Sequence, residues 1–453
     1  MPALRSFVRI VVAAAATLLA APAPAALAVM HGFPDLTSVT LWVQADRAGP
    51  VDIELAPQAG GEARRLALVA EPAADFVVTT RVPGLQPGTA YRYRVAAQGE
   101  VREGVIATQP YWSRGAEAAE LTIAIGSCAF MPPENPAWPG RDYGGDFQIF
   151  DAIAAKKPGL MLWLGDNLYL QPPDFLDPAA AAAHYRHVRQ APALQKLLTA
   201  TGHIAIWDDH DFGPNDSDGS YPLKGETLRL FQRYWPNPVY GLPGVPGAFG
   251  WARYGDVDFF LLDNRYYRHP NRYPDVPEKS MFGAAQFEWL KQALVSSRAR
   301  IKIVAGGSQF WNRASRFEGL HEFPQEQQRL ADWLVERRID GVIFLSGDRH
   351  FGELLRIERP GAYPLHEYTS SPLTSRAVPN PSRAERENPD VVPGTFQAKR
   401  QFGMIRVSGP ASDRRIALEA YDSDGELLWR HVLAANDLRF GRGAAPQGTG
   451  QAR

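Results

Sequence analysis

The chain has little of several features that mark particular protein classes. It contains one cysteine, Cys128, so no intramolecular disulfide can stabilise it, and its stability must come from a buried core, with or without metals. Its 48 Lys and Arg residues nearly balance 49 Asp and Glu residues, so no general positive field can hold a nucleic acid. No fixed-period repeat is visible, which excludes solenoids and propellers.

Long hydrophobic runs are also missing after the N-terminus. A membrane span needs ~20 apolar residues, and no later segment has them. With 45% hydrophobic and 21% charged residues, the 453-residue chain has the composition of a folded globular protein. Its length predicts two domains or one large one, because a single domain has roughly 150 residues.

The N-terminus has the pattern of a secretory signal. Arg5 and Arg9 precede an apolar run over residues 10–21, and Ala26-Leu27-Ala28 has the small-x-small form of a cleavage site. The alternative is an uncleaved membrane anchor, but the apolar run is shorter than a span. We therefore expect residues 1–28 to be removed and the protein to be periplasmic or secreted.

Residues 29–109 are expected to form a small all-β domain. Short β-rich runs at 38–44, 51–55, 76–82 and 91–97 are separated by Gly and Pro turns, without a helical period. This spacing is typical of an antiparallel sandwich of the immunoglobulin or fibronectin type III kind.

From residue 110 onward the pattern changes to an α/β one. Apolar strand-like runs alternate with amphipathic stretches such as 146–156 and 324–337, which predicts a layered α/β domain over 110–435. Residues 403–432 alternate like a hairpin around an acidic turn at 422–425. Residues 436–453 are rich in Gly, Arg and Gln and are expected to be a disordered tail.

Five of the apolar runs end in clusters of polar residues. In layered α/β proteins the ligand crevice lies outside the carboxyl ends of the strands, so we expect these clusters to converge. Cys128 follows the run 121–125, and Asp166 and Tyr169 follow the run 160–164. The run 203–207 is followed by Asp208, Asp209, His210 and Asp211. Arg265 and Arg268 follow the run 259–262, and Asp348 and His350 follow the run 342–345.

Such a cluster of acidic residues favours metal binding. Gathered away from water, the carboxylates would repel one another unless cations neutralise them. Thiolate and phenolate donors suit ferric iron, whereas an oxygen-rich neighbouring position suits calcium, magnesium or manganese. Paired ions of this kind bind phosphoryl oxygens and activate water, while an imidazole can protonate the departing alkoxide. The sequence therefore predicts a two-metal hydrolase.

Each motif also has an ordinary interpretation. A lone residue such as Cys128 is often a small apolar part of the core, and Asp166 after a glycine could close a turn. An EF-hand at residues 214–225 is excluded, because Pro214 and Gly225 would occupy the first and last ligand positions. His184 and His187 lie three residues apart on an expected helix, where packing or solvent exposure explains them.

Taken together, five ordered motifs resemble the alkaline phosphatase D (PhoD-like) metallophosphatases, which are related in site geometry to purple acid phosphatases. The segment 369–373 and the strand-rich N-terminus resemble the same family. The fold this implies is α/β, a metallophosphatase-type layered β-sandwich flanked by helices, preceded by the small all-β domain. The motifs are Gly126-Ser127-Cys128, Gly165-Asp166-x-x-Tyr169, Trp207-Asp208-Asp209-His210-Asp211, Leu262-Asp263-x-Arg265-x-x-Arg268 and Gly347-Asp348-x-His350.

The resemblance also implies roles for individual residues. His210 would face the leaving group as an acid or hydrogen-bond donor, and Arg265 or Arg268 would clamp the phosphate. Asp208, Asp211 and Asn215 could be extra calcium ligands or could hold the ligands in place. The implied iron ligands are Cys128, Asp166, Tyr169 and His350, and Asp166 would bridge to a calcium-type site completed by Asp209 and Asp348.

Two features depart from the family pattern. The family is often exported through a twin-arginine signal, whereas Arg5 and Arg9 are separated, so metal loading outside the cytoplasm becomes an alternative. The third loop continues through residues 212–216 differently from some members, which leaves monoester and diester substrates both open.

The predicted function is therefore an exported, metal-dependent phosphoric-ester hydrolase, an alkaline phosphatase or phosphodiesterase acting on a small phosphate ester. One alternative is a phospholipid-directed phosphodiesterase of the same fold. Another is a non-catalytic, metal-stabilised surface module that binds a partner. No specific nucleic-acid partner is expected, and the sequence does not give the oligomeric state.

Overall fold

The computed structural model describes residues 27–111, 118–133, 143–379 and 381–441. Residues 1–26 of the expected signal and residues 442–453 of the expected tail lie outside this range. Leu27 and Ala28, the last residues of the expected signal, are buried, and the first strand begins at Ala28. A cut after Ala28 would therefore remove Leu27 from the core of the N-terminal domain and Ala28 from the apolar cluster shared with the main domain.

The N-terminal domain consists of two antiparallel sheets, as the fold prediction requires. Apolar residues alternate along the strands, so one face of each sheet lines a shared core that includes Val29, Leu41, Ile53 and Tyr93. One sheet contains β1 (Ala28–His31), β2 (Ser38–Gln44) and β5 (Val77–Pro83); the other contains β4 (Arg64–Ala70), β3 (Gly49–Pro57), β6 (Ala90–Ala97) and β7 (Glu100–Ala107).

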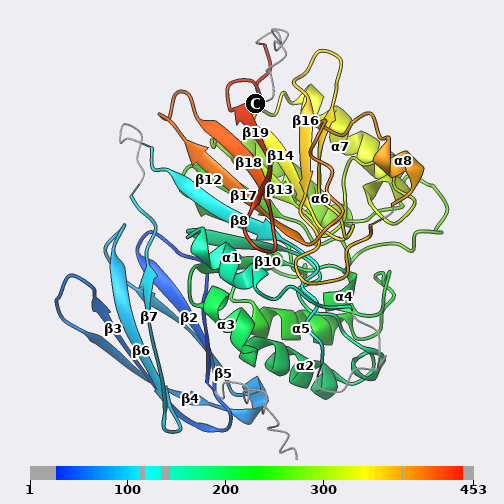
Figure 1. Cartoon of the computed structure of the whole chain (residues 1–453). Helices are drawn as coiled ribbons and strands as arrows, with labels where there is room; N and C mark the ends of the chain where they lie inside the picture. The colour runs from blue at the N-terminus through cyan, green and yellow to red at the C-terminus, as the bar shows by residue number, and fades with distance from the viewer. Residues whose placement is uncertain (1–26, 112–117, 134–142, 380, 442–453) are drawn as a thin grey trace, which may run out of the picture.

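The other face of the three-stranded sheet packs on the main domain. Met30 and Trp42 belong to the same apolar cluster as the helices of that domain. The Trp42 indole donates a hydrogen bond to the Arg233 carbonyl at 2.7 Å, and the Val29 amide donates to Gln195 Oε1 at 3.1 Å. The N-terminal domain, blue in Figure 1, is thus anchored beside the main domain by apolar and polar contacts.

Two six-stranded sheets form the centre of the main domain. In the first, β8, β9 and β10 are parallel, and in the second, β12, β13, β14 and β16 are parallel. The strand order of the first sheet is β10 (Gly202–Ile206), β9 (Leu160–Leu164), β8 (Leu121–Gly126), β17 (Gln401–Ser408), β18 (Arg415–Asp422), β19 (Leu427–Ala434). The strand order of the second sheet is β11 (Gly250–Tyr254), β12 (Val257–Leu261), β13 (Ile301–Ala305), β14 (Val342–Ser346), β16 (Leu365–Thr369), β15 (Glu353–Ile357).

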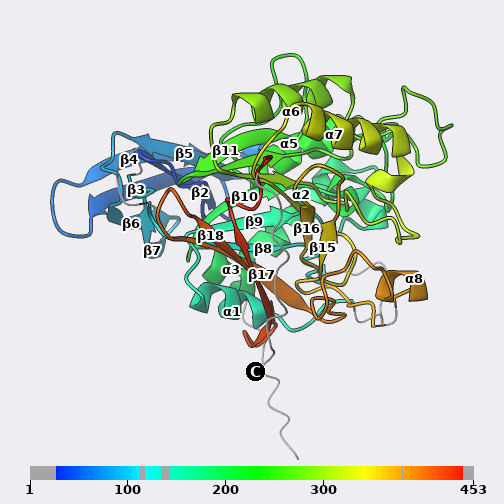
Figure 2. The same cartoon turned by 90° about the horizontal axis from the view of Figure 1, so that it is seen from above.

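Helices cover the outer faces of both sheets and complete four layers. Parallel strands are buried on both faces, which explains uninterrupted apolar runs such as β9. Figure 2 shows α6 and α7 on one side of the main domain and α1 on the other. The helices over the first sheet are α1 (Ile149–Ala155), α2 (Pro178–Gln190), α3 (Pro192–Leu198) and α5 (Lys224–Tyr234); those over the second are α6 (Ala284–Ser296) and α7 (Pro324–Glu336).

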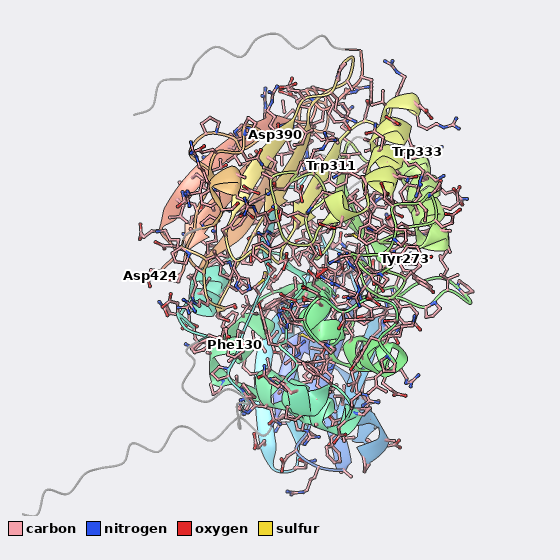
Figure 3. The ribbon with its side chains drawn as sticks, turned by 90° about the vertical axis from the view of Figure 1, so that its right-hand side faces the viewer. Phe130, Tyr273, Trp311, Trp333, Asp390 and Asp424 are labelled. Carbon is pink, nitrogen blue, oxygen red and sulfur yellow. The ribbon has the colours of Figure 1, made fainter. Side chains whose placement is uncertain are left out.

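Short elements and turns connect these layers. They are α4 (Asp209–Phe212), α8 (Arg383–Arg386) and the 3-10 helices at Pro72–Ala74, Pro172–Asp174 and Leu320–Glu322. The acidic segment at 422–425 is a turn between β18 and β19, where Gly425 has a φ of 85°. In Figure 3, Asp424 of this turn lies at the outer edge, whereas Trp311 lies inside the main domain. Within the described residues, no helix is long and apolar enough to cross a membrane.

Candidate metal centre

The predicted polar clusters meet at one edge of the two central sheets. Cys128 follows β8, Asp166 follows β9, Asp209 follows β10 and His350 follows β14. In the first sheet β8, β9 and β10 are parallel to one another, and in the second sheet β14 is parallel to β13 and β16, so the carboxyl ends of these strands lie at a common edge. Residues far apart in the sequence are therefore brought into one site by the sheet topology.

The first group of donor atoms contains the four residues predicted as iron ligands. Cys128 Sγ, a carboxylate oxygen of Asp166 and a ring nitrogen of His350 all lie within 4.8 Å of one another. The Tyr169 hydroxyl donates a hydrogen bond to Asp166 Oδ2 at 3.4 Å and lies 3.1 Å from His350 Nε2. One thiol, one carboxyl, one phenol and one imidazole thus face each other.

The second group shares Asp166 with the first. Donor atoms of Asp166, Asp209 and His210 lie within 4.8 Å of one another. The imidazole of His210 stacks on the Tyr169 ring at a centroid distance of 4.2 Å. Asp166 belongs to both groups: its Oδ2 accepts a hydrogen bond from Cys128 Sγ at 3.5 Å, and its Oδ1 accepts one from the His210 amide at 3.3 Å.

Asp348 stands beside these groups on the loop after β14. Its carbonyl accepts a hydrogen bond from Cys128 Sγ at 3.6 Å, and its carboxylate lies 3.7 Å from Arg349 Nη1. Asp348 Oδ2 and Asp209 Oδ1 are buried and have no hydrogen-bond partner among the described residues. Each oxygen has a guanidinium at ion-pair distance, 3.7 Å for Asp348 Oδ2 and 3.9 Å for Asp209 Oδ1, but makes no hydrogen bond, so both oxygens can accept a further ligand.

The backbone at the centre is strained. Cys128, Asp166, Asp348 and His350 have φ angles of 57°, 51°, 66° and 56°, in the left-handed region that costs a non-glycine residue about 1–2 kcal/mol. Such conformations persist where the surroundings fix them, and they concentrate at functional sites. Here the loops after β8 and β9 hold each other, since the Cys128 amide donates to the Gly165 carbonyl at 3.2 Å.

Electrostatics disfavours the charged forms in the protein alone. Burial raises the pKa of Asp166 well above its usual value, and the negative charge of Asp209 raises it further. Burial also raises the pKa of Asp348, of the Cys128 thiol and of the Tyr169 phenol. A cation would reverse this effect, because it stabilises the deprotonated form of each group. The donor set and the unpartnered oxygens therefore fit metal ions.

Asp208 and Asp211 are hydrogen-bonded to other residues of the site. The Asp211 carboxylate accepts hydrogen bonds from the amides of Asn167, Leu168 and Asp208, at 3.0 to 3.1 Å, and so shapes the loop after β9. Burial raises the pKa of Asp211 to about 8. Asn215 lies in the loop whose Asp216 amide donates to Asp209 Oδ2 at 2.8 Å.

The two predicted phosphate-clamp arginines are buried and paired. Arg265 and Arg268 have side chains with 0% exposure, and both bind the carboxylate of Glu318, at 2.9 and 2.8 Å. Arg265 also binds Asp208 through Nε. Neither guanidinium faces solvent here, so direct contact with a phosphate stays a prediction, and the observed contacts are to acidic side chains.

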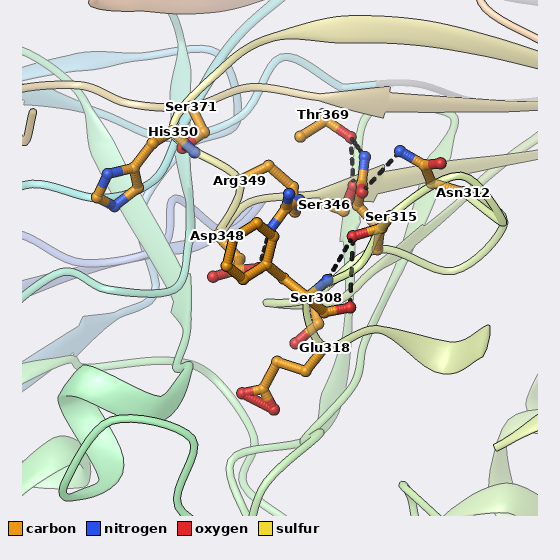
Figure 4. A network of polar contacts seen from close by, with 12 residues as sticks. Ser308, Asn312, Ser315, Glu318, Ser346, Asp348, Arg349, His350, Thr369 and Ser371 are labelled. Atoms are coloured by element: carbon orange, nitrogen blue, oxygen red, sulfur yellow. Dashed lines mark hydrogen bonds and ion pairs between the residues drawn. The ribbon is translucent and has the colours of Figure 1, made fainter. Parts of the chain in front are cut away.

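Sequence reasoning missed Glu318 and Arg349. Glu318 lies in the loop that follows β13, a sixth strand end at the same edge. The signal was present, because the apolar run 301–305 leads into Gly306-Gly307-Ser308-Gln309. Arg349 separates two predicted ligands, is 7% exposed and pairs with Glu385. Figure 4 shows Asp348, Arg349 and His350 on one loop, with Glu318 nearby.

The fold and the donor groups define a metal-dependent phosphatase of the metallophosphatase type. Residues 123–410, more than half of the sequence, match the family model of the PhoD-like phosphatases. The chain belongs to the PhoD-like phosphatase family, which confirms the resemblance seen in the five motifs.

Solved structures agree in fold. The structure of PhoD is 20% identical, with a TM-score of 0.70, and the match covers 93% of this chain and 92% of that one. The purple acid phosphatase PPD1 isolated from yellow lupin (Lupinus luteus) seeds is 12% identical, with a TM-score of 0.68 and coverages of 95% and 78%. A search of curated protein sequences gave no match. At these identities the structures establish the layered fold with its N-terminal all-β domain.

Proposed function

We propose that the protein is an exported hydrolase of small phosphoric esters, monoesters or diesters, that works with two metal ions. The observation that carries this proposal is the pair of donor groups that share Asp166. A carboxylate between two donor groups can bind one ion with each oxygen, which is the arrangement of a two-metal site. The signal-like N-terminus supports export to the periplasm or the medium.

The two positions differ in chemistry. Cys128, Asp166, Tyr169 and His350 would hold ferric iron, because a thiolate and a phenolate suit a strongly Lewis-acidic ion. Asp166, Asp209 and Asp348 would hold a hard cation such as calcium, magnesium or manganese. When bound, these ions would stabilise charge on the phosphoryl oxygens and lower the pKa of a water.

His210 supplies hydrogen-bonding capacity at the leaving-group side. Its ring is fixed against Tyr169, and its amide donates to Asp166 Oδ1 at 3.3 Å, so the imidazole is held at the centre. Burial lowers the pKa of His210, so above neutral pH the ring is uncharged and keeps one N–H. That N–H can donate to the ester oxygen as the phosphorus–oxygen bond breaks.

Arg265 acts as a positioning residue in this proposal. It contacts Asp208 and lies 3.9 Å from Asp209 Oδ1, so its charge holds two carboxylates of the loop after β10 together. Glu318 in turn fixes the guanidinium from the opposite side. The metal ions and His210 would then bind the phosphate, and the arginine pair would hold the carboxylates of the site in place.

The test is hydrolysis of 4-nitrophenyl phosphate and bis(4-nitrophenyl) phosphate by the purified chain, before and after chelation and after iron and calcium are restored. We expect turnover of at least one ester, loss on chelation and recovery with metals. The variant Asp424→Asn, with the same chemical change on the exposed β18–β19 turn, is the control for Asp166→Asn and should keep full activity. A folded, metal-bearing protein that hydrolyses neither ester would refute the proposal and favour the surface binding module.

A further inference from the structure

A large aromatic side chain stands exposed next to the metal centre. Phe317 is 63% exposed, although its neighbour Glu318 is buried and binds both Arg265 and Arg268. Phe317 lies in the loop between β13 and the 3-10 helix at Leu320–Glu322. An exposed phenylalanine by itself needs no explanation. Phe317 does need an explanation, because the next residue along the chain, Glu318, belongs to a buried ion-pair network of the candidate site.

The backbone around Phe317 is fixed. The Phe317 amide donates to Ser315 Oγ at 3.2 Å, and the Ser315 hydroxyl donates back to the Phe317 carbonyl at 3.3 Å. Ser315 is itself buried, and Figure 4 shows it in the same part of the site as Ser308 and Glu318. The ring is therefore presented by an anchored loop, which lowers the entropy lost when a ligand binds to it.

Arg349 connects the ring to the centre. Its guanidinium carbon lies 4.6 Å from the centroid of the Phe317 ring, and its Nη1 lies 3.7 Å from the Asp348 carboxylate. Arg349 is held by Glu385, so it forms a fixed link between a predicted metal ligand and the aromatic ring. A cation over an aromatic face is attractive and helps to keep the ring in place.

The ring lies on the open side of the centre. The Asp348 side chain is 20% exposed, whereas the Asp209 side chain is 5% exposed and Cys128 and Asp166 are buried. Solvent therefore reaches the centre near Asp348, the residue that Arg349 links to Phe317. A substrate whose phosphate sits at the centre would carry its alcohol outward through this side.

We propose that Phe317 is the platform on which the alcohol part of the substrate stacks, and that the enzyme prefers esters whose alcohol carries a planar aromatic ring. This inference rests on the proposed function. Offset stacking of two rings is favourable, and a base stacked on an aromatic side chain gains about 1–3 kcal/mol, or roughly 5- to 150-fold in binding. The class includes aryl esters and nucleoside esters.

The test uses two substrates with the same leaving oxygen. Adenosine 5′-monophosphate and ribose 5-phosphate both release a primary alcohol, but only the first carries an aromatic ring. For the wild type we expect kcat/KM to be at least about 5-fold higher for the nucleotide, the lower end of the stacking range. If the enzyme acts only on diesters, the methyl esters of both compounds serve instead. If the two compounds bind but are not hydrolysed, their Ki values as inhibitors of 4-nitrophenyl ester hydrolysis are compared with each other instead.

Variants assign the preference to the ring. Phe317→Ala should remove most of the preference and leave ribose 5-phosphate unchanged, while Phe317→Trp should keep it. Val295→Ala, which truncates a 60% exposed side chain on α6, should change neither substrate. The inference would be overturned if the wild type had the same kcat/KM for the two compounds, or if Phe317→Ala lowered kcat/KM equally for both. If the wild type hydrolyses no phosphate ester at all, the proposed function fails and the inference falls with it.

Discussion

Glu318 offers a sharp test of the charge network behind the metal centre. Its buried carboxylate is the shared partner of Arg265 and Arg268, whose side chains are fully buried. Burial acts to raise the pKa of Glu318, but the charges of the two arginines lower it below its usual value, so it is ionised at neutral pH. Glu318→Gln keeps the shape and removes the charge.

The magnitude follows from the burial of the pair. Removing one partner of a buried ion pair costs about 3–5 kcal/mol, because the remaining charge has no compensation. The unfolding entropy is ~2.1 cal/mol/K per residue, and the main domain has about 300 residues, so the lost 3–5 kcal/mol lowers Tm by about 5–8 °C. Arg268 would then keep only its hydrogen bond to Asn271 Oδ1 at 2.7 Å, and two of its nitrogens already lack a hydrogen-bond partner among the described residues.

The assay is thermal unfolding followed by circular dichroism, with metal content measured on the same samples. The matched control is Glu322→Gln, four residues away, where the side chain is 37% exposed and the partner is His321 at 3.4 Å. Such a surface pair contributes about 0–1 kcal/mol, so Tm should fall by less than about 2 °C. An unchanged Tm in Glu318→Gln would show that the buried network does not stabilise the site.

Three further predictions concern the ligands, the proton donor and a buried acid. Asp166→Asn and Cys128→Ser should each lose a metal ion and more than about 100-fold in kcat/KM, which elemental analysis and kinetics will show, while Asp424→Asn loses neither. His210→Ala should keep its metals but lose about 10²- to 10⁴-fold in kcat, and an unchanged kcat would exclude the proposed role. Burial raises the pKa of Glu353 to about 8, from 4.5, so the wild type should lose stability between pH 4.5 and 8 as the unfolded chain ionises. Urea unfolding of Glu353→Gln should lack this part of the pH dependence, and an identical dependence would contradict the assignment.

The convergence of these polar residues was predictable because they lie at strand ends. A buried parallel strand is a recognisable apolar run, and its carboxyl end is fixed in space by the sheet. Cys128, Asp166 and His350 could therefore be placed together before any contact was known. The all-β N-terminal domain was predictable for a similar reason, since alternation and turns are local signals.

The contacts that were missed are non-local. Nothing in the sequence around Arg265 says that its partner is Glu318, 53 residues later, so this ion pair was not predicted. The C-terminal region was described as a hairpin, whereas β17 also pairs with β8, from the far end of the domain. The helix expected over 146–156 is shorter, at Ile149–Ala155, because Asp146 has a φ of 54° and cannot continue it.

The central claim is that two metal ions sit on the donor groups that share Asp166. Elemental analysis of the purified, unchelated wild type tests it most directly, with aryl ester turnover recorded on the same sample. The account predicts iron together with calcium, magnesium or manganese, close to one of each per chain, in a protein that hydrolyses the ester. A folded protein that contains no metal and retains its activity would contradict it.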